Sequence, residues 1–183
     1  REVSFGQDGT YSPEAIVRTA NADLANSFGN LAQRSLSMIF KNLGGELSND
    51  YEVHPDDQAL LAEIDDMAGS KLPAAFEELA FSVGIEDWIR AVFATNQYVD
   101  TQAPWGLRKA DPERMRAVLM TLFKAVRTLA IAIRPVVPAS SDKLLDQMGI
   151  GEGARDYAAL NDAAWFDTLV ASGFTVGQPI AIF

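Results

Sequence analysis

The chain has 183 residues, 48% of them hydrophobic and 22% charged, which is the composition of one ordinary globular domain. It contains no cysteine, which excludes disulfides and thiolate metal sites, and no apolar run of the roughly 20 residues that a membrane span needs. The net charge of −10 argues against a nucleic-acid partner, because Lys and Arg make most phosphate contacts. The charge is uneven, however: twelve acidic residues and one lysine occupy 46–87, whereas seven basic and two acidic residues occupy 105–134. Such runs are usually solvated helix faces, so the average charge leaves the partner open.

The first predicted helix covers residues 13–42. Residues 1–12 contain turn signals and are expected to be a connector. Ser12-Pro13-Glu14 then provides an N-cap, a proline at the first helical position and an acid in the first turn. Gly44-Gly45 ends the helix. Residues at helical spacing predict its buried face: Leu24, Phe28, Leu31, Ser35 and Ile39.

Two further helices are predicted before residue 103. One begins at Pro55, is kinked or divided by Pro73 and ends near Gly84. The next runs from about Ile85 to Gln102, where Ala103-Pro104-Trp105-Gly106 stops it. Its inward-facing candidates are Trp88, Ile89, Val92, Phe93, Asn96 and Val99.

The remaining predicted helices cover 112–134 and 138–148. Asp111-Pro112-Glu113 starts the first of them, and Gly149 ends the second. Beyond Gly151 the pattern predicts a short helix within 163–170 and a β-leaning tail over 174–183. The fold class is therefore all-α, a bundle of about five main helices over 13–150, with a C-terminal helix and tail over 151–183 packing back on it.

No independent active site is expected. The only histidine, His54, lies in a polar linker, where surface exposure is commoner than catalysis. One histidine cannot complete a di-iron bundle site, and no Walker loop, G-x-G-x-x-G or G-x-S-x-G motif is present. The carboxylates Glu63, Asp65 and Asp66 are interpreted as solvated. We therefore predict no catalytic residue, no metal site and no cofactor in this chain.

A binding surface for unpaired RNA bases is the alternative. Asn30 and Arg34 are four residues apart, so they share one helix face, and an amide with a guanidinium can hydrogen-bond base edges. Trp105 follows Pro104 at a helix exit, where an exposed indole could stack on a base. Arg108 and Lys109 suit backbone phosphates. Spacing alone leaves open that Trp105 caps the core and that Asn30 and Arg34 are ordinary polar-face residues.

Several stretches resemble one known family. DLANSFGNLAQR (23–34) is similar to the first helix of the anticodon-binding domain of methionyl-tRNA synthetases, and NQYVDTQAPWGLRK (96–109) resembles that family's Asn-x-Tyr-[Val/Ile]-Asp-x-x-x-Pro-Trp signature. Residues 111–138 and the opening FGQDGTYS (5–12) also fit. Isoleucyl-, leucyl- and valyl-tRNA synthetases share the architecture, but the Pro-Trp ending favours methionine. The tail QPIAIF (178–183) departs from the family's usual Pro-Leu-Phe ending.

The resemblance implies that Asn30, Arg34 and Trp105 recognise the CAU anticodon, with Trp105 stacking on the wobble cytosine. It implies a parent methionine–tRNA ligase that works in the cytoplasm, away from membranes and DNA, and uses ATP with Mg in an N-terminal catalytic domain. The motifs of that domain are absent here, so this chain alone is expected to be inactive. The competing hypothesis is a helical scaffold that binds protein partners through its acidic surface.

Overall fold

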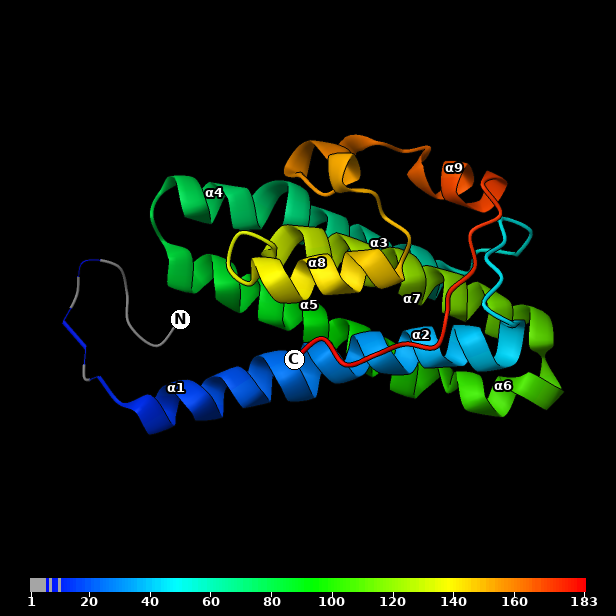
Figure 1. Cartoon of the computed structure of the whole chain (residues 1–183), viewed down its shortest axis with the longest axis horizontal. Helices are drawn as coiled ribbons and strands as arrows, with labels where there is room; N and C mark the ends of the chain where they lie inside the picture. The colour runs from blue at the N-terminus through cyan, green and yellow to red at the C-terminus, as the bar shows by residue number, and fades with distance from the viewer. Residues whose placement is uncertain (1–5, 7, 10) are drawn as a thin grey trace.

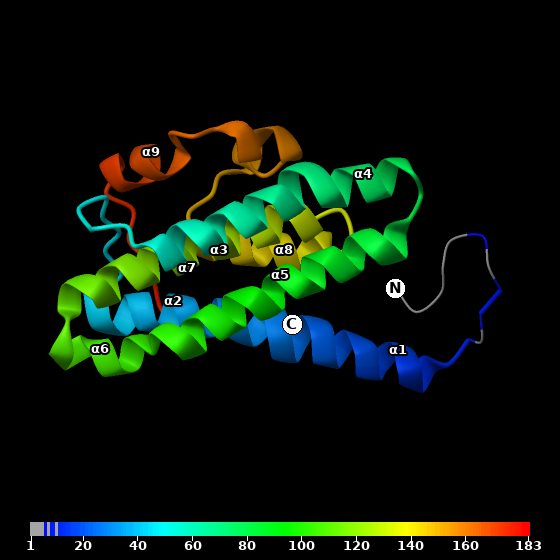
Figure 2. The ribbon, with the colours of Figure 1, turned by 180° about the vertical axis from the view of Figure 1, so that it is seen from behind.

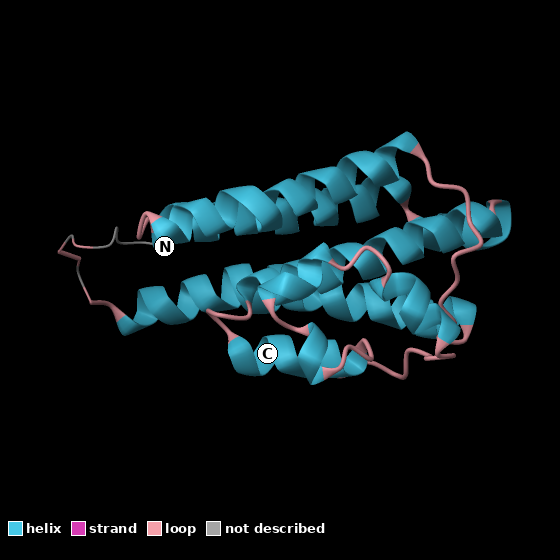
Figure 3. Ribbon diagram, turned by 90° about the horizontal axis from the view of Figure 1, so that it is seen from above, coloured by secondary structure: helices cyan, strands magenta, loops and turns pink. Residues whose placement is uncertain are grey.

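The computed structural model describes residues 6, 8, 9 and 11–183, so most of the connector predicted over 1–12 lies outside the described residues. The described chain is built from helices, and Figure 3 shows no strand among them. Among the residues that the structure describes, the tail predicted to be β-leaning forms one antiparallel β-bridge, between Glu46 and Thr175. The predicted all-α class is confirmed. Among the described residues, no helix is both long and apolar enough to cross a bilayer.

The first helical rod runs without interruption through α1 (Pro13–Thr19), the π-helical segment η1 (Ala20–Gly29) and α2 (Asn30–Leu43) (Figure 1). Ser12 caps it as predicted, because its Oγ accepts a hydrogen bond from the N–H of Ala15 at 3.2 Å. Gly44 ends it in the left-handed conformation, with φ of 65°. The π-helical geometry was not predicted, and it ends one residue before Asn30.

The predicted second helix is divided into α3 (Pro55–Asp66), the π-helical η2 (Met67–Lys71) and α4 (Leu72–Glu77). The prediction that it ends near Gly84 is wrong. The chain turns at Leu79, which has φ of 57°, and Gly84 lies inside α5 (Phe81–Gln102). A Cβ at Gly84 would lie 2.9 Å from the Leu72 side chain, so this glycine lets α4 and α5 approach closely.

The most deeply buried helix is α7 (Pro112–Ile133), which packs against α2, α3, α5 and α8 (Pro138–Gln147). Asp111 caps α7 as predicted, because its Oδ1 accepts from the N–H of Arg114 at 2.9 Å. Between α5 and α7 lies a helix that was not predicted, α6 (Pro104–Ala110), which occupies one end of the bundle (Figure 2). Ala103, with φ of 44°, makes the break between α5 and α6.

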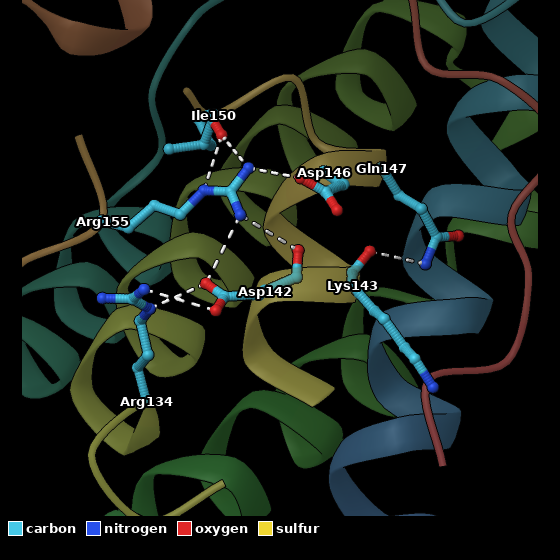
Figure 4. A network of polar contacts seen from close by, with 7 residues as sticks. All are labelled: Arg134, Asp142, Lys143, Asp146, Gln147, Ile150 and Arg155. Carbon is cyan, nitrogen blue, oxygen red and sulfur yellow. Dashed lines mark hydrogen bonds and ion pairs between the residues drawn. The ribbon is translucent and has the colours of Figure 1, made fainter. Parts of the chain in front are cut away.

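The segment after Gly151 returns to the bundle through short 3₁₀ turns and α9 (Trp165–Ala171). Arg155 fixes its start: the guanidinium donates to the carbonyl of Ile150 and to the carboxylates of Asp142 and Asp146 on α8 (Figure 4). Further on, Trp165 packs over the guanidinium of Arg127 at 4.2 Å. Burial lowers the pKa of Arg127 to about 10. The tail then runs along α2 (Figure 1).

Candidate nucleic-acid interface

The polar face shared by α2 and α5 is organised around Arg34. Its guanidinium donates to the carboxylate of Asp100 and to the side-chain carbonyl of Asn96, both at 3.2 Å. Asn96 is itself oriented by a bond from its amide to the carbonyl of Val92 at 3.1 Å. The Arg34 side chain remains 37% exposed. The guanidinium is therefore held in place by long bonds and still open to a ligand.

Asn30 lies in the same surface hollow as Arg34, which confirms that the two share one face. The hollow has a volume of about 520 Å³ and opens between α2 and α5. Asn30 is exposed, as are Asn26 and Gln33 beside it. The polar lining offers amide donors and acceptors together with one cation, which is the chemistry that recognises the edges of unpaired bases. The complete lining is Asn26, Asn30, Gln33, Arg34, Ser37, Asn96 and Asp100.

Trp105 lies in the first turn of α6 and is 56% exposed. The possibility that it caps the core is therefore excluded. Gly106 leaves the surface beside it open, because a Cβ added there would meet no atom within 4 Å. Pro104, by contrast, is buried and anchors the turn. The indole thus presents an accessible face just beyond the C-terminal end of α5, the helix that carries Asn96 and Asp100.

Arg108 and Lys109 occupy the last turn of α6 and are both exposed. They follow Trp105 by three and four residues, so all three lie on neighbouring positions of one short helix. Cations so placed can contact the phosphates on either side of a base held at the indole.

A buried ionic network fixes the corner from which Trp105 projects. Arg114 donates to both carboxylate oxygens of Asp57, at 2.6 and 2.7 Å, and to the side chain of Gln102 at 2.8 Å. The hydroxyl of Tyr98 donates to the same Asp57 carboxylate at 2.5 Å. Because Tyr98 and Gln102 belong to the last turns of α5, this network holds the end of that helix against α3 and α7. The break between α5 and α6 at Ala103 is thereby placed two residues before Trp105.

The pKa of Asp57 shows which effect dominates in this network. Burial acts to raise it, but the hydrogen bonds from Arg114, from Tyr98 and from the backbone of His54 outweigh burial, so the pKa of Asp57 is lowered. The pKa of Tyr98 is raised by burial and by its bond to Asp57. Asp57 is thus ionised and fully buried. It belongs to the acidic stretch 46–87, which the sequence analysis interpreted as solvated helix faces, so the burial of Asp57 was not predicted.

Several members of the hollow were missed in the sequence analysis. Asn26, Gln33, Ser37 and Asp100 were not recognised as part of it, although Asp100 lies within the quoted motif. Phe93 was predicted to face inward, and this is wrong, because its side chain is 52% exposed. Trp88, in contrast, is buried as predicted, and its indole N–H donates to the carbonyl of Leu129 at 3.0 Å.

His54 lies outside this face, in a separate polar hollow lined also by Asp50, Glu52 and Arg116. Within the part of the chain that the structure describes, no cluster of three or more histidine, cysteine or acidic side chains is arranged to hold a metal ion. Glu63, Asp65 and Asp66 on α3 are exposed, and the Asp66 carboxylate pairs with the Lys71 ammonium at 2.7 Å.

Comparison with known proteins shows which family the chain resembles. The family described as "Anticodon binding domain of methionyl tRNA ligase" matches residues 49–183. Methionine–tRNA ligases of Mesorhizobium japonicum and Mycobacterium leprae are 42% and 40% identical to it. Both matches cover 100% of this chain and 34% of the relative, so the chain spans about a third of these proteins.

Solved structures give the same result. The chain superimposes on the methionyl-tRNA synthetase of Mycobacterium tuberculosis, in the form bound by methionyl-adenylate, with a TM-score of 0.88 and 38% identity. The match covers 100% of this chain and 36% of the synthetase chain. The ligand-free form of that enzyme matches equally well, with a TM-score of 0.88.

Proposed function

Because the chain belongs to the family of anticodon-binding domains of methionyl-tRNA ligases, we propose that it recognises the CAU anticodon of the methionine tRNA. The surface proposed for this is the face formed by Asn30, Arg34 and Trp105. The observation that carries the proposal is their joint accessibility: Asn30 and Arg34 share one polar hollow, and an exposed indole lies at the end of the helix that forms its other wall.

Each side chain has a distinct role in the proposed complex. The indole of Trp105 stacks on the wobble cytosine, an interaction worth roughly 1–3 kcal/mol per base. Asn30 and Arg34 hydrogen-bond to base edges. A wrong base would present a donor in place of an acceptor, or the reverse, and would leave a polar group unpaired. Arg108 and Lys109 neutralise adjacent phosphates. Affinity then comes partly from charge and stacking, whereas selectivity comes from the hydrogen bonds.

The proposed setting is a longer methionine–tRNA ligase in the cytoplasm. In that enzyme a separate catalytic domain would use ATP with Mg to join methionine to the tRNA, and the present chain would contribute recognition of the anticodon loop. The share of about a third that the chain covers in its relatives supports this division of labour.

A comparative titration tests the proposal. Fluorescently labelled anticodon stem-loops, one carrying CAU and one altered only at the first anticodon base, are titrated with the chain at the same salt concentration. We expect the CAU loop to bind at least about fivefold more tightly, because a mismatched base typically costs about 1–3 kcal/mol. Equal affinities would contradict anticodon recognition, and negligible binding of both loops at low salt would favour the scaffold hypothesis.

A further inference from the structure

Phe93 is an exposed aromatic side chain in the middle of α5, with 52% of its surface accessible. Its neighbours on the outer face of the helix are polar: Arg90, Gln97 and Asp100 are all exposed. Single exposed apolar residues are common on protein surfaces, so exposure alone does not indicate a binding site. The position of Phe93 on the helix is more informative.

Phe93 lies on the same side of α5 as the groups that contact Arg34. Asp100 follows it by seven residues, which is close to two full helical turns, so the two side chains project in nearly the same direction. Asn96, three residues on, is one turn away on the edge that faces α2. Both Asn96 and Asp100 bond to the Arg34 guanidinium. The phenyl ring therefore projects from the side of α5 that carries the two partners of Arg34, outside the lining of the polar hollow itself.

Two exposed aromatic side chains thus lie on either side of Asn96 and Asp100 in chain order, Phe93 before them on α5 and Trp105 after them on α6. At a rise of about 1.5 Å per residue, the nine residues from Phe93 to Gln102 span about 13 Å along α5. Three bases stacked at 3.4 Å intervals span only about 7 Å. This length of α5 already exceeds that stack, so it suits bases that are splayed apart, as proteins hold them when they recognise RNA loops.

We infer that Phe93 is a second stacking platform, which receives a base of the anticodon loop other than the one at Trp105. The inference rests on the proposed function, because it takes the same RNA loop as ligand. Stacking on a phenyl ring needs no particular hydrogen-bond pattern, so Phe93 contributes affinity and fixes the path of the strand. The amides and the guanidinium between the two rings then meet bases whose spacing is already set.

The test pairs Phe93→Ala with loops that lack single bases. The probes are the labelled CAU stem-loop and a series in which each anticodon-loop nucleotide in turn is replaced by an abasic one. We expect Phe93→Ala to weaken binding of the intact loop by about 5- to 30-fold, within the range known for stacked bases. On one abasic loop the loss should disappear, because the partner base is already missing.

Two variants serve as controls. Phe93→Tyr keeps an aromatic face and should bind the intact loop within about twofold of the parent chain. Val83→Ala removes an exposed apolar side chain from the same helix, away from the hollow, and should change nothing.

Unchanged binding by Phe93→Ala would overturn the inference. So would an equal loss on every abasic loop, because it would mean a general structural effect rather than a stacked partner. The proposed function is judged separately by the preference of the parent chain for the CAU loop, which does not involve Phe93→Ala. A parent chain that prefers CAU while Phe93→Ala binds normally would reject this inference alone.

Discussion

Two arginines contact opposite sides of α5, and their surroundings differ in every respect that matters for binding. Arg114 reaches from α7 to Gln102 and is paired with Asp57, to which Tyr98 also donates. The pair has bonds of 2.6 and 2.7 Å, and the Arg114 side chain is 8% exposed. Arg34 approaches Asn96 and Asp100 from α2 through bonds of 3.2 Å and is 37% exposed. One guanidinium is sealed inside the protein, and the other faces solvent.

The difference separates the frame of the molecule from its recognition surface. A buried pair with short bonds has no capacity for a ligand, and its disruption leaves an uncompensated charge in the interior. An exposed guanidinium with long bonds loses little when it exchanges a protein partner for an RNA base. Because both arginines bond to α5, the sealed pair fixes the helix along which the open surface is arranged.

The largest expected difference between the buried and the exposed arginine pair is in their contribution to stability. Asp57→Ala leaves the Arg114 cation buried without its partner, and we expect it to lower the free energy of unfolding by about 3–5 kcal/mol. Urea denaturation followed by circular dichroism measures this. The matched variant Asp100→Ala breaks the exposed pair and should cost no more than about 1 kcal/mol. Similar losses for the two variants would remove the distinction between frame and surface.

Arg34→Ala should impair RNA binding rather than stability, in contrast to Asp57→Ala. The variant removes charged hydrogen bonds to the RNA, and we expect it to weaken binding of the CAU stem-loop by about 1.5–3 kcal/mol. Its free energy of unfolding should stay within about 1 kcal/mol of the parent chain, because the pair that it breaks is exposed. Binding is followed by fluorescence anisotropy and unfolding by urea titration. A variant that unfolds easily but binds normally would reverse the assignment of the two arginines.

Acid gives the smallest of these effects, because protonation neutralises Asp57 without removing its side chain. The pKa of Asp57 is lower in the folded chain than its usual value of 3.8, so its ionisation stabilises the fold above that value. The contribution is lost as pH falls through the folded-state pKa. The difference in unfolding free energy between the parent chain and Asp57→Asn should therefore shrink from about pH 5 downward. A difference that is independent of pH would show that ionisation of Asp57 does not stabilise the fold.

Helix ends with local signals were predictable from the sequence. Ser12, Gly44 and Asp111 act on backbone groups within a few residues of themselves, so their capping roles follow from residue type and position. The turn at Leu79 was not predictable, because no glycine or proline marks it. Gly84 was wrongly predicted to end a helix. It allows close contact between α4 and α5, and such a tertiary contact cannot be recognised from the local sequence pattern.

The functional side chains were predictable in part. Asn30 and Arg34 share a face because of their helical spacing, and the resemblance to a known family singled them out together with Trp105. The partners of Arg34 on α5 come from residues more than 60 positions away, so no local pattern reveals them. Phe93 was predicted to face inward from the apolar pattern along its helix, whereas its exposure depends on which side of α5 the neighbouring helices cover.

The most direct test of the account is the affinity of Trp105→Ala for the CAU stem-loop, measured beside its unfolding free energy. We predict binding weaker by about 1–3 kcal/mol with stability nearly unchanged, because the indole is 56% exposed and its main contact would be a base. Binding equal to that of the parent chain would contradict the claim that this face of α2, α5 and α6 recognises the anticodon.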